Sequence, residues 1–364
     1  MRLPNHGANP QNVYQQLGLT MPEVVYDFSE NVNAAGPPAF VEARWRTFYP
    51  LIQRYPDPDG EPFLTKVAAF HQVEKNTILL GNGASELFSV LARRYANKRV
   101  IIVHPTFSEY ERTLRAAGAT IVPIVVTDFI NYTLPLEQLQ QEMMTADAVY
   151  LCTPNNPTGV LPNKGNLLAL IAHGAIVNCE LVIDEAFMDW VDEAHSLIQF
   201  SAQNPHVIVV RSMTKMYAIP GLRLGYLVAH ATIVGALKEM LPHWNLNAFA
   251  LVIGASCLDE QHYCQQAITY AAAQREWLHR YLQDNGCQVT NSVTNYVCFS
   301  LPKTQQADAF FSYCLAQGVV LRHTKNFQGM QGEWFRIGIK DIAAMTSLHN
   351  CLQTWFNLNK GREK

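Results

Sequence analysis

The stretch DAVYLCTPNNPTG, residues 147–159, joins a short apolar run to a turn built from asparagine, proline and glycine. Similar apolar runs lie on both sides of it along the chain. They are TILLG at 77–81, RVIIVHP at 99–105, TIVPIVV at 120–126, ELVIDEA at 180–186, VIVVRS at 207–212 and LGYLVA at 224–229. Short runs rich in valine and isoleucine and bounded by turn-forming residues predict β-strands.

The stretches between these runs have a different period. In SELFSVLARRYAN (85–97), SEYERTLRAAG (108–118) and KGNLLALIAHGAIVN (164–178), apolar residues recur every three or four positions, which predicts helices. Strands that alternate with helices favour an α/β fold with a mostly parallel central sheet and helices on both of its faces.

The pattern changes after about residue 245. A long helical region reaches Asp284, and shorter strand candidates then alternate with helices, ending in a final helix. We therefore expect a large domain over residues 41–245 and a smaller α+β domain over 246–364. An N-terminal arm, 1–40, is expected to be irregular and to join the small domain.

Composition limits the kind of partner. The formal net charge is −3, so no basic surface indicates nucleic acid, and a small molecule is the expected partner. The longest apolar run, FALVIGASCL at 249–258, is too short to span a membrane, and the N-terminus does not resemble a signal peptide. The eight cysteines show no metal-ligand spacing with the histidines, and we expect them to be reduced in a cytoplasmic protein without a structural metal.

Five successive strand candidates end in polar, turn-prone or charged residues: GNGASE, HPTFSEY, TPNNPTG, DEAF and RSMTK. In open α/β sheets, ligands bind at the carboxyl ends of the strands. Asp184 and Lys215 thus stand at neighbouring strand ends. Taken singly, Asp184 is equally well read as a helix cap or ion-pair partner, and Lys215 as a solvated loop lysine.

Taken together, the two residues and the glycine-rich turn suit pyridoxal phosphate. This cofactor needs an amine for a Schiff base, a carboxylate opposite its pyridine nitrogen and an anion site for its phosphate. The GNGASE turn precedes a predicted helix, so the amides of Ala84 and Ser85 are candidates for the phosphate site.

The sequence resembles the fold-type I pyridoxal phosphate enzymes, in the class I and II aminotransferase branch that includes histidinol-phosphate aminotransferase. The resemblance covers nearly the whole chain. It is carried, in order, by RYP at 54–56, GNGASE, PTF, NNPTG, DEAF, SMTK with an arginine eight residues after its lysine, TNY and WFRIGI.

The resemblance implies roles for the matched residues. Lys215 is the expected Schiff-base lysine and proton carrier, and Asp184 is the expected partner of the pyridinium nitrogen. Asn156 is expected to bond the phenolic oxygen of the cofactor and to face the substrate, and Phe107 to stack on the ring. The implied phosphate ligands are Gly83, Ala84, Ser85, Ser212 and Arg223.

Two further roles concern the neighbouring subunit and the substrate. Tyr55 matches a tyrosine that reaches the cofactor phosphate of the other subunit, so a homodimer with shared sites is implied. Arg336 resembles an arginine that grips a substrate carboxylate, for which its planar fork is suited, although a structural ion pair is the alternative. Phe187 departs from the pattern, because many relatives have tyrosine there and phenylalanine offers no hydroxyl.

The set of motifs along the chain, including HGxN at residues 6–9 and Phe187, resembles the threonine-phosphate decarboxylases of cobalamin biosynthesis more closely than the histidinol-phosphate aminotransferases. That resemblance implies conversion of L-threonine O-3-phosphate to (R)-1-amino-2-propanol O-phosphate. The candidates for binding the substrate phosphate are Arg322, His6 and Asn31, although Arg322 is alternatively a surface residue of a strand edge.

Three other functions are alternatives to this reading. An aminotransferase of the histidinol-phosphate type would use the same cofactor residues. A catalytically silent descendant is disfavoured because Lys215, Asp184, Asn156 and Arg223 are all present. A nicotinamide-dependent dehydrogenase is disfavoured because no GxGxxG follows an early strand.

Overall fold

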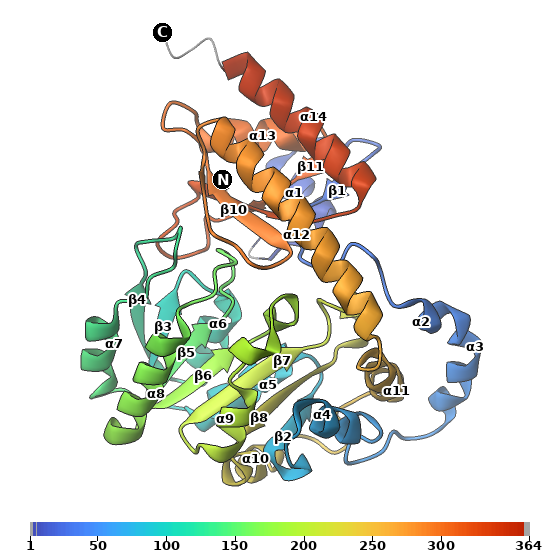
Figure 1. The fold of residues 1–364 in the computed structure, drawn as a ribbon, viewed down its shortest axis with the longest axis vertical. Coiled ribbons are helices and arrows are strands. Elements are labelled where there is room, and N and C mark those ends of the chain that lie inside the picture. Colours follow the sequence, from blue (N-terminus) through green and yellow to red (C-terminus); the bar gives the residue numbers. More distant parts are fainter. Residues whose placement is uncertain (1–2, 5, 360–364) are drawn as a thin grey trace.

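The structure, a computed structural model, describes residues 3–4 and 6–359. Two sheets form the cores of two lobes, and the long helix α12 (Gln261–Asp284) runs from one lobe toward the other (Figure 1). None of the described helices is both long and apolar enough to cross a bilayer.

The large lobe is built on a seven-stranded sheet of order β2-β8-β7-β6-β5-β3-β4. Strand β8 runs antiparallel to both of its neighbours, β2 and β7, and the other pairings are parallel. The strands are β2 (Ile78–Gly81), β3 (Arg99–His104), β4 (Thr120–Val125), β5 (Ala148–Cys152), β6 (Glu180–Asp184), β7 (Val207–Ser212) and β8 (Gly225–Ala229). The predicted α/β class with a mostly parallel sheet is confirmed.

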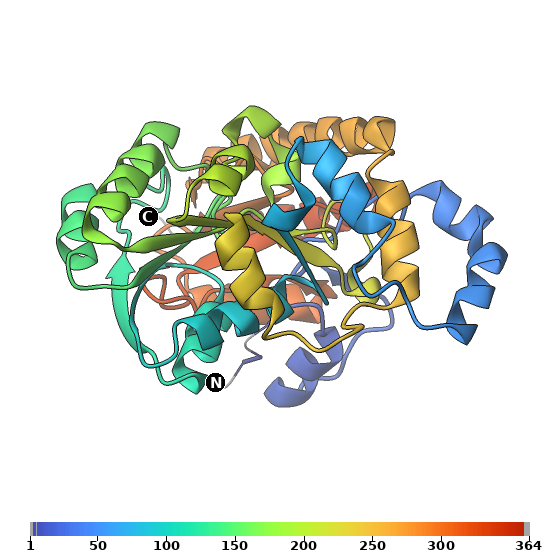
Figure 2. The same ribbon diagram turned by 90° about the horizontal axis from the view of Figure 1, so that it is seen from below.

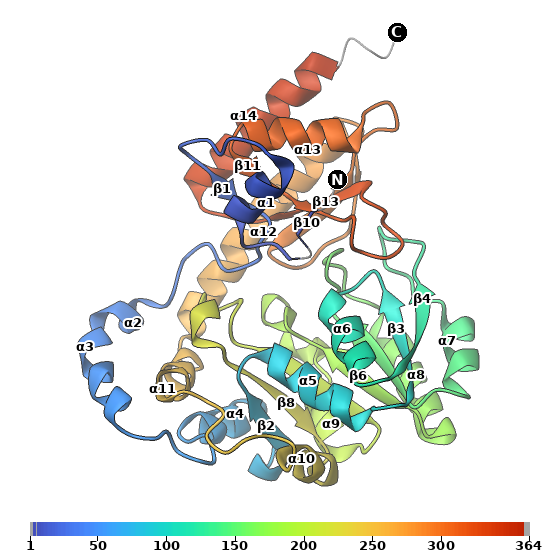
Figure 3. The same cartoon turned by 180° about the vertical axis from the view of Figure 1, so that it is seen from behind.

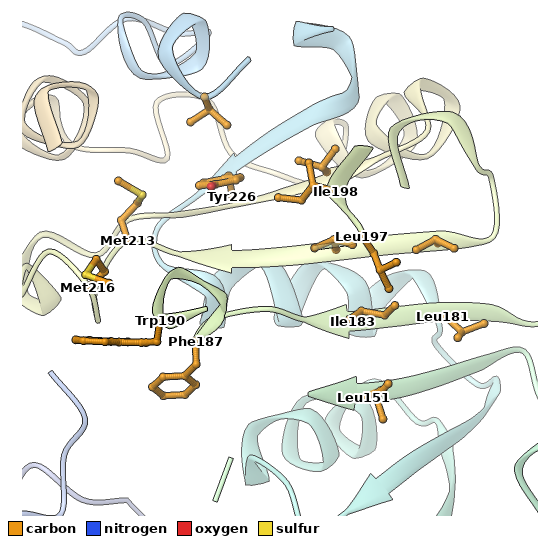
Figure 4. Close-up of a cluster of buried hydrophobic side chains, with 14 of the residues drawn as sticks. Leu151, Leu181, Ile183, Phe187, Trp190, Leu197, Ile198, Met213, Met216 and Tyr226 are labelled. Atoms are coloured by element: carbon orange, nitrogen blue, oxygen red, sulfur yellow. The ribbon is translucent and has the colours of Figure 1, made fainter. Parts of the chain in front are cut away.

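Helices cover both faces of this sheet, as Figure 2 shows from below. Successive side chains of a strand point to opposite faces. Val149 and Leu151 therefore join one apolar cluster, whereas Ala148 and Tyr150 join the other. Figure 4 shows part of the first cluster, with Leu151, Leu181 and Ile183 on adjacent strands.

The helices of the large lobe fall into two groups by the cluster they contact. The first cluster is covered by α4 (Phe63–His71), α7 (Leu136–Met143), α8 (Lys164–Val177), α9 (Ile198–Gln203) and α11 (Ala248–Cys257). The second is covered by α5 (Ala84–Arg94), α6 (Ser108–Ala116) and α10 (Ala231–Lys238). Short 3₁₀ turns lie at η1 (Tyr49–Gln53), η2 (Lys75–Thr77), η3 (Met188–Trp190), η4 (Glu193–His195) and η5 (Pro220–Leu222).

The small lobe contains an antiparallel sheet of order β12-β13-β10-β9 and a separate parallel pair, β1-β11. Its strands are β1 (Tyr26–Asp27), β9 (Gln288–Val289), β10 (Tyr296–Ser300), β11 (Val319–Val320), β12 (Arg322–His323) and β13 (Trp334–Gly338). Its helices are α1 (Pro10–Leu17), α13 (Ala307–Ala316) and α14 (Ile342–Asn359), together with part of α12.

Two expectations about the small lobe were wrong in detail. The N-terminal segment is not wholly irregular, because α1 begins at an Asn9 cap and ends at Gly18, which has φ 64°. The run VVLR at 319–322, one of the shorter strand candidates after residue 245, is not one strand, because β11 pairs with β1 whereas β12 pairs with β13. The prediction missed this change of partner because a local pattern does not show with which strand each residue pairs.

Helices α2 (Ala39–Ala43) and α3 (Trp45–Phe48) lie apart from both sheets, at one side of the molecule (Figures 1 and 3). Large apolar side chains of this segment are exposed to solvent. They include Trp45, Tyr49, Ile52 and Tyr55.

Candidate active site

A cavity of about 230 Å³ is lined by residues at the carboxyl ends of the parallel strands and by residues of the small lobe and the N-terminal segment. This is the position where α/β sheets bind ligands. Twelve of the fourteen predicted site residues line it: His6, Asn31, Ala84, Ser85, Phe107, Asn156, Asp184, Ser212, Lys215, Arg223, Arg322 and Arg336. The other two are Gly83, which caps α5 beside the cavity, and Tyr55.

Lys215 follows β7 in a turn. Its side chain lies largely out of solvent, and desolvation, followed by the nearby charge of Arg336, lowers the pKa of its amine to about 8. Among the described residues no hydrogen bond engages its Nζ, so the amine is available to a ligand in the cavity. The backbone carbonyl of Lys215 accepts a hydrogen bond from the Asn33 amide at 3.0 Å, which fixes the turn to the segment after β1.

Asp184 ends β6 and is buried. Its Oδ1 accepts a hydrogen bond from the Ala186 amide at 2.9 Å, and its Oδ2 accepts one from the Tyr110 hydroxyl. Burial raises the pKa of Asp184 to about 6, although both hydrogen bonds oppose the rise. A buried carboxylate of this kind is stabilised in its charged form by a cation in the cavity, such as a protonated pyridine nitrogen.

Tyr110 was not among the predicted site residues. It lies in the first turn of α6, three positions after Phe107, and its ring packs edge-on against the Phe107 ring with centroids 5.7 Å apart. Residues three apart on a helix share a face, so Tyr110 follows Phe107 toward the strand ends. That spacing was the available signal.

Arg211 was also missed. It is fully buried at the end of β7, and it donates to Glu185 at 3.0 Å, to Asp189 at 3.0 Å and to Glu193 at 2.7 Å. Arg211 precedes Ser212 and Glu185 follows Asp184, so this network ties the ends of two adjacent strands together. It thereby fixes the spacing between the carboxylate of Asp184 and the turn that carries Lys215.

The first turn of α5 meets Arg223. Gly83 has φ 76°, which disfavours a side chain there, and a Cβ on Gly83 would collide with the guanidinium of Arg223. Ala84, Ser85, Ser212 and Arg223 all line the cavity. Helix N-termini attract anions, so the arrangement suits a phosphate group.

Arg336 is held inside β13 by two hydrogen bonds. Its Nη1 donates to Asn156 Oδ1 at 2.5 Å and its Nη2 donates to the Ser29 carbonyl at 2.7 Å. Its Nε is buried and has no hydrogen-bond partner in the described part of the chain. A buried guanidinium with a donor left over is a strong site for an anionic ligand.

Arg322 approaches the same space from β12. Its Nη2 donates to Asn326 Oδ1 at 2.7 Å, and its Nη1 donates to the His323 carbonyl at 3.0 Å. Burial and the nearby charge of Arg336 lower the pKa of Arg322 to about 9. The expectation that Arg322 faces the site, and not a solvent-exposed strand edge, agrees with this placement.

The N-terminal segment contributes His6 and Asn31. The His6 ring lies 5.8 Å from the ring of Phe107, and burial lowers the pKa of the imidazole. Asn31 is buried, and its Oδ1 has no partner among the described residues. Both residues line the same cavity as Arg322 and Arg336.

Two further residues were singled out in the sequence, Tyr55 for a shared site and Phe187 as a departure from the family motif. Tyr55 is 82% exposed, and its ring packs on Trp244 outside the cavity with centroids 5.0 Å apart. Phe187 lines the cavity and packs edge-on against Tyr296, with ring centroids 5.0 Å apart. Because phenylalanine has no hydroxyl, it offers no hydrogen-bond donor to a ligand in the cavity.

Two solved structures share this fold over nearly the whole chain. The crystal structure of L-threonine-O-3-phosphate decarboxylase from Porphyromonas gingivalis matches with a TM-score of 0.80 and 24% identity, over 91% of this chain and 99% of that one. Histidinol-phosphate aminotransferase from Sinorhizobium meliloti, solved in complex with pyridoxal-5'-phosphate, matches with a TM-score of 0.83 and 21% identity, over 96% and 94%. At these identities the likeness establishes the fold alone.

The chain belongs to the aminotransferase class I and II family, whose profile matches residues 24–349. A curated relative, threonine-phosphate decarboxylase from Salmonella typhimurium, is 34% identical over 346 residues, which is 93% of each chain. The family resemblance inferred from the motifs is thus confirmed.

Proposed function

We propose that the protein is a pyridoxal phosphate-dependent lyase that removes the carboxylate of L-threonine O-3-phosphate and yields (R)-1-amino-2-propanol O-phosphate for cobalamin biosynthesis. One observation carries the proposal: the cavity with Lys215 and Asp184 also contains two buried arginines, Arg322 and Arg336. A substrate with both a phosphate and a carboxylate matches that charge. The likeness to the Salmonella decarboxylase supports the same choice.

The residues present fit pyridoxal 5'-phosphate. Lys215 would bind it covalently, Asp184 would pair with its ring nitrogen, and Phe107 would stack on the ring. Asn156 Nδ2 would donate to the phenolic oxygen, because Oδ1 of that residue already accepts from Arg336. The phosphate would lie between the first turn of α5, Ser212 and Arg223.

When bound, the cofactor supplies an electron sink that weakens a bond at the substrate α-carbon. Which bond breaks depends on how the residues of this chain orient the substrate. Arg322, His6 and Asn31 would hold the substrate phosphate, and Arg336 would hold its carboxylate. After carbon dioxide leaves, the Nζ of Lys215 would donate a proton to the α-carbon, which replaces the lost carboxylate.

An aminotransferase of the histidinol-phosphate type is the second candidate. Its substrate also has a phosphate, so the Arg322 region would serve either reaction, and the cofactor residues would be the same. The difference lies in which α-carbon substituent is held out of the ring plane.

We further propose that the protein is a cytoplasmic homodimer with shared sites. The exposed Trp45, Tyr49, Ile52 and Tyr55 belong to the segment around α3 and η1, at one side of the large lobe. Exposed apolar patches of this kind mark interaction surfaces. Tyr55 would thereby reach the cofactor phosphate of the second subunit.

The proposed reaction is tested by incubating the cofactor-loaded protein with L-threonine O-phosphate in the absence of a keto acid. Stoichiometric carbon dioxide and aminopropanol phosphate, absent with Lys215→Ala, are expected. If no carbon dioxide appears and histidinol phosphate instead converts the cofactor to its amine form, the aminotransferase reading replaces the lyase.

A further inference from the structure

The loop between β12 and β13 places one apolar ring inside an otherwise cationic part of the cavity. Phe327 lines the cavity and is 5% exposed. The guanidinium carbon of Arg322 lies over its ring, 4.9 Å from the centroid. The neighbouring residue, Asn326, accepts a hydrogen bond from the same guanidinium at 2.7 Å. Two consecutive loop residues therefore contact Arg322, one through a ring face and one through an oxygen.

The loop is fixed at several points, so the ring has a defined position. The Phe327 amide donates to the Thr324 carbonyl at 2.9 Å, and the Met330 amide donates to the Phe327 carbonyl at 3.1 Å. The Thr324 hydroxyl donates to the Trp334 carbonyl at 2.7 Å. Phe327 also packs in an apolar cluster with Met330 and Trp334.

We propose that Phe327 selects a phosphorylated substrate that has a methyl group beside its phosphate, and that its ring face also positions Arg322. The inference rests on the proposed function, in which Arg322 holds the substrate phosphate. In threonine phosphate the methyl group and the phosphoester oxygen are bonded to the same carbon. A phosphate bound at Arg322 therefore places the methyl group next to the ring stacked on Arg322.

Serine phosphate lacks this methyl group and would leave the ring face in contact with water or empty space. A single methyl group in an apolar pocket is worth about a tenfold or greater preference in binding. Among the other phenylalanines of the cavity, Phe88 and Phe107 contact Tyr110, and Phe187 contacts Tyr296. Phe327 contacts the guanidinium of Arg322.

The two roles predict different results for different substitutions. Phe327→Ala removes both the apolar contact and the ring face, so it should weaken binding and abolish the preference for the methylated ligand. Phe327→Leu keeps apolar volume but removes the π face that attracts a cation. It should weaken phosphate ligands with and without the methyl group by similar factors of a few-fold. Phe327→Tyr keeps the ring and should retain both properties.

The test is calorimetric titration of the cofactor-loaded protein with two reaction products, (R)-1-amino-2-propanol O-phosphate and 2-aminoethyl phosphate. Wild type should prefer the methylated ligand by about tenfold. Phe129→Leu is the matched control, because Phe129 packs edge-on against Trp334 in the same cluster at 5.5 Å but does not line the cavity. It should leave the preference unchanged.

An unchanged preference in Phe327→Ala, or an equal loss in Phe129→Leu, would overturn the inference while leaving the proposed function intact. Absence of binding of both phosphoamines to wild type would overturn the phosphate substrate itself, and the inference with it. Because the readout is the affinity of products, the result does not depend on carbon dioxide release.

Discussion

The carboxylate of Asp184 and the amine of Lys215 have pKa values displaced toward each other, to about 6 and about 8. Burial is the largest cause in both cases. Displaced pKa values of a neighbouring acid and base are typical of active sites. The sequence identified both residues, because each follows an apolar strand. It did not identify Tyr110 or Arg211, because the partners of both side chains, Asp184 for Tyr110 and Glu185 for Arg211, come together only in the folded chain.

Tyr110→Phe tests the support of Asp184. The hydroxyl stabilises the charged carboxylate, so its removal should raise the pKa of Asp184 by about one unit. In the proposed function Asp184 pairs with the cofactor only when ionised. The cofactor affinity of the apo protein should therefore fall as the pH drops, and this fall should begin at higher pH in the variant. Titrating the apo proteins with the cofactor at a series of pH values from about 5 to about 9 measures the pH at which the affinity falls.

Tyr95→Phe is the matched control. The Tyr95 hydroxyl also donates to a carboxylate, that of Glu180, at 2.5 Å, but this pair lies outside the cavity. Its pH profile should equal that of wild type. Superimposable profiles for all three proteins would show that Tyr110 does not support Asp184.

Lys215→Met should stabilise the apo protein at neutral pH. The pKa of Lys215 in the folded state is about 8, below the ordinary value of 10.5, so the unfolded chain binds more protons between these values. Stability of wild type therefore rises with pH through that window, and below it the lysine costs the folded state about 3 kcal/mol. Denaturant unfolding at pH near 7 and near 10 should show a gain for the variant that shrinks at the higher pH.

Lys66→Met is the control for this comparison, because Lys66 is exposed and pairs with Asp259 on the surface at 2.7 Å. It should show no gain at neutral pH. A Lys215 variant that is less stable than wild type at neutral pH would contradict the displaced pKa.

At the scale of the element, the decisive feature is the contact between the first turn of α5 and the arginine that follows η5. The sequence predicted helix α5 and the roles of Gly83 before it and of Arg223 after SMTK as phosphate ligands. It could not predict how closely they approach, because Gly83 and Arg223 are far apart in the chain. Likewise, the split between β11 and β12 depends on pairing with β1 and β13, so it could not be read from a local pattern.

Gly83→Ala should weaken cofactor binding by at least about tenfold while leaving the fold intact, because the new Cβ displaces Arg223 and the backbone there favours glycine. Fluorescence titration of the apo variant with pyridoxal phosphate measures the loss. Gly18→Ala is the control, since its φ of 64° is also positive but its Cβ would have nothing within 4 Å. Equal affinities for the two variants would show that the contact between Gly83 and Arg223 does not govern cofactor binding.

At the scale of the whole molecule, the sequence predicted a mostly parallel sheet, a smaller lobe and the strand ends that meet at the cavity, because periodicity and strand-end residues report on them directly. The domain boundaries at residues 40 and 245 stay predictions. The structure shows that residues of the N-terminal segment, of β12 and of β13 line one cavity together with residues at the strand ends of the large sheet. Contributions from such distant segments follow from tertiary packing, which local patterns do not contain.

Shared sites can be tested by mixing two inactive variants. In a dimer of Lys215→Ala with Tyr55→Ala, one site combines an intact Lys215 with an intact Tyr55 from the other subunit. Coexpression should therefore restore about a quarter of the wild-type sites, as random pairing into twofold dimers predicts. No recovery above the two parent variants would mean that Tyr55 does not serve the partner's site.

The central claim is that carbon–carbon cleavage, and not amino transfer, takes place at this site. The most direct measurement uses L-threonine O-phosphate labelled with ¹³C in its carboxylate and follows the label by NMR with the cofactor-loaded protein and a keto acid present. With a decarboxylase, the label appears in carbon dioxide and bicarbonate while the amine product accumulates unlabelled. Label retained in a keto acid product would contradict the central claim and establish amino transfer instead.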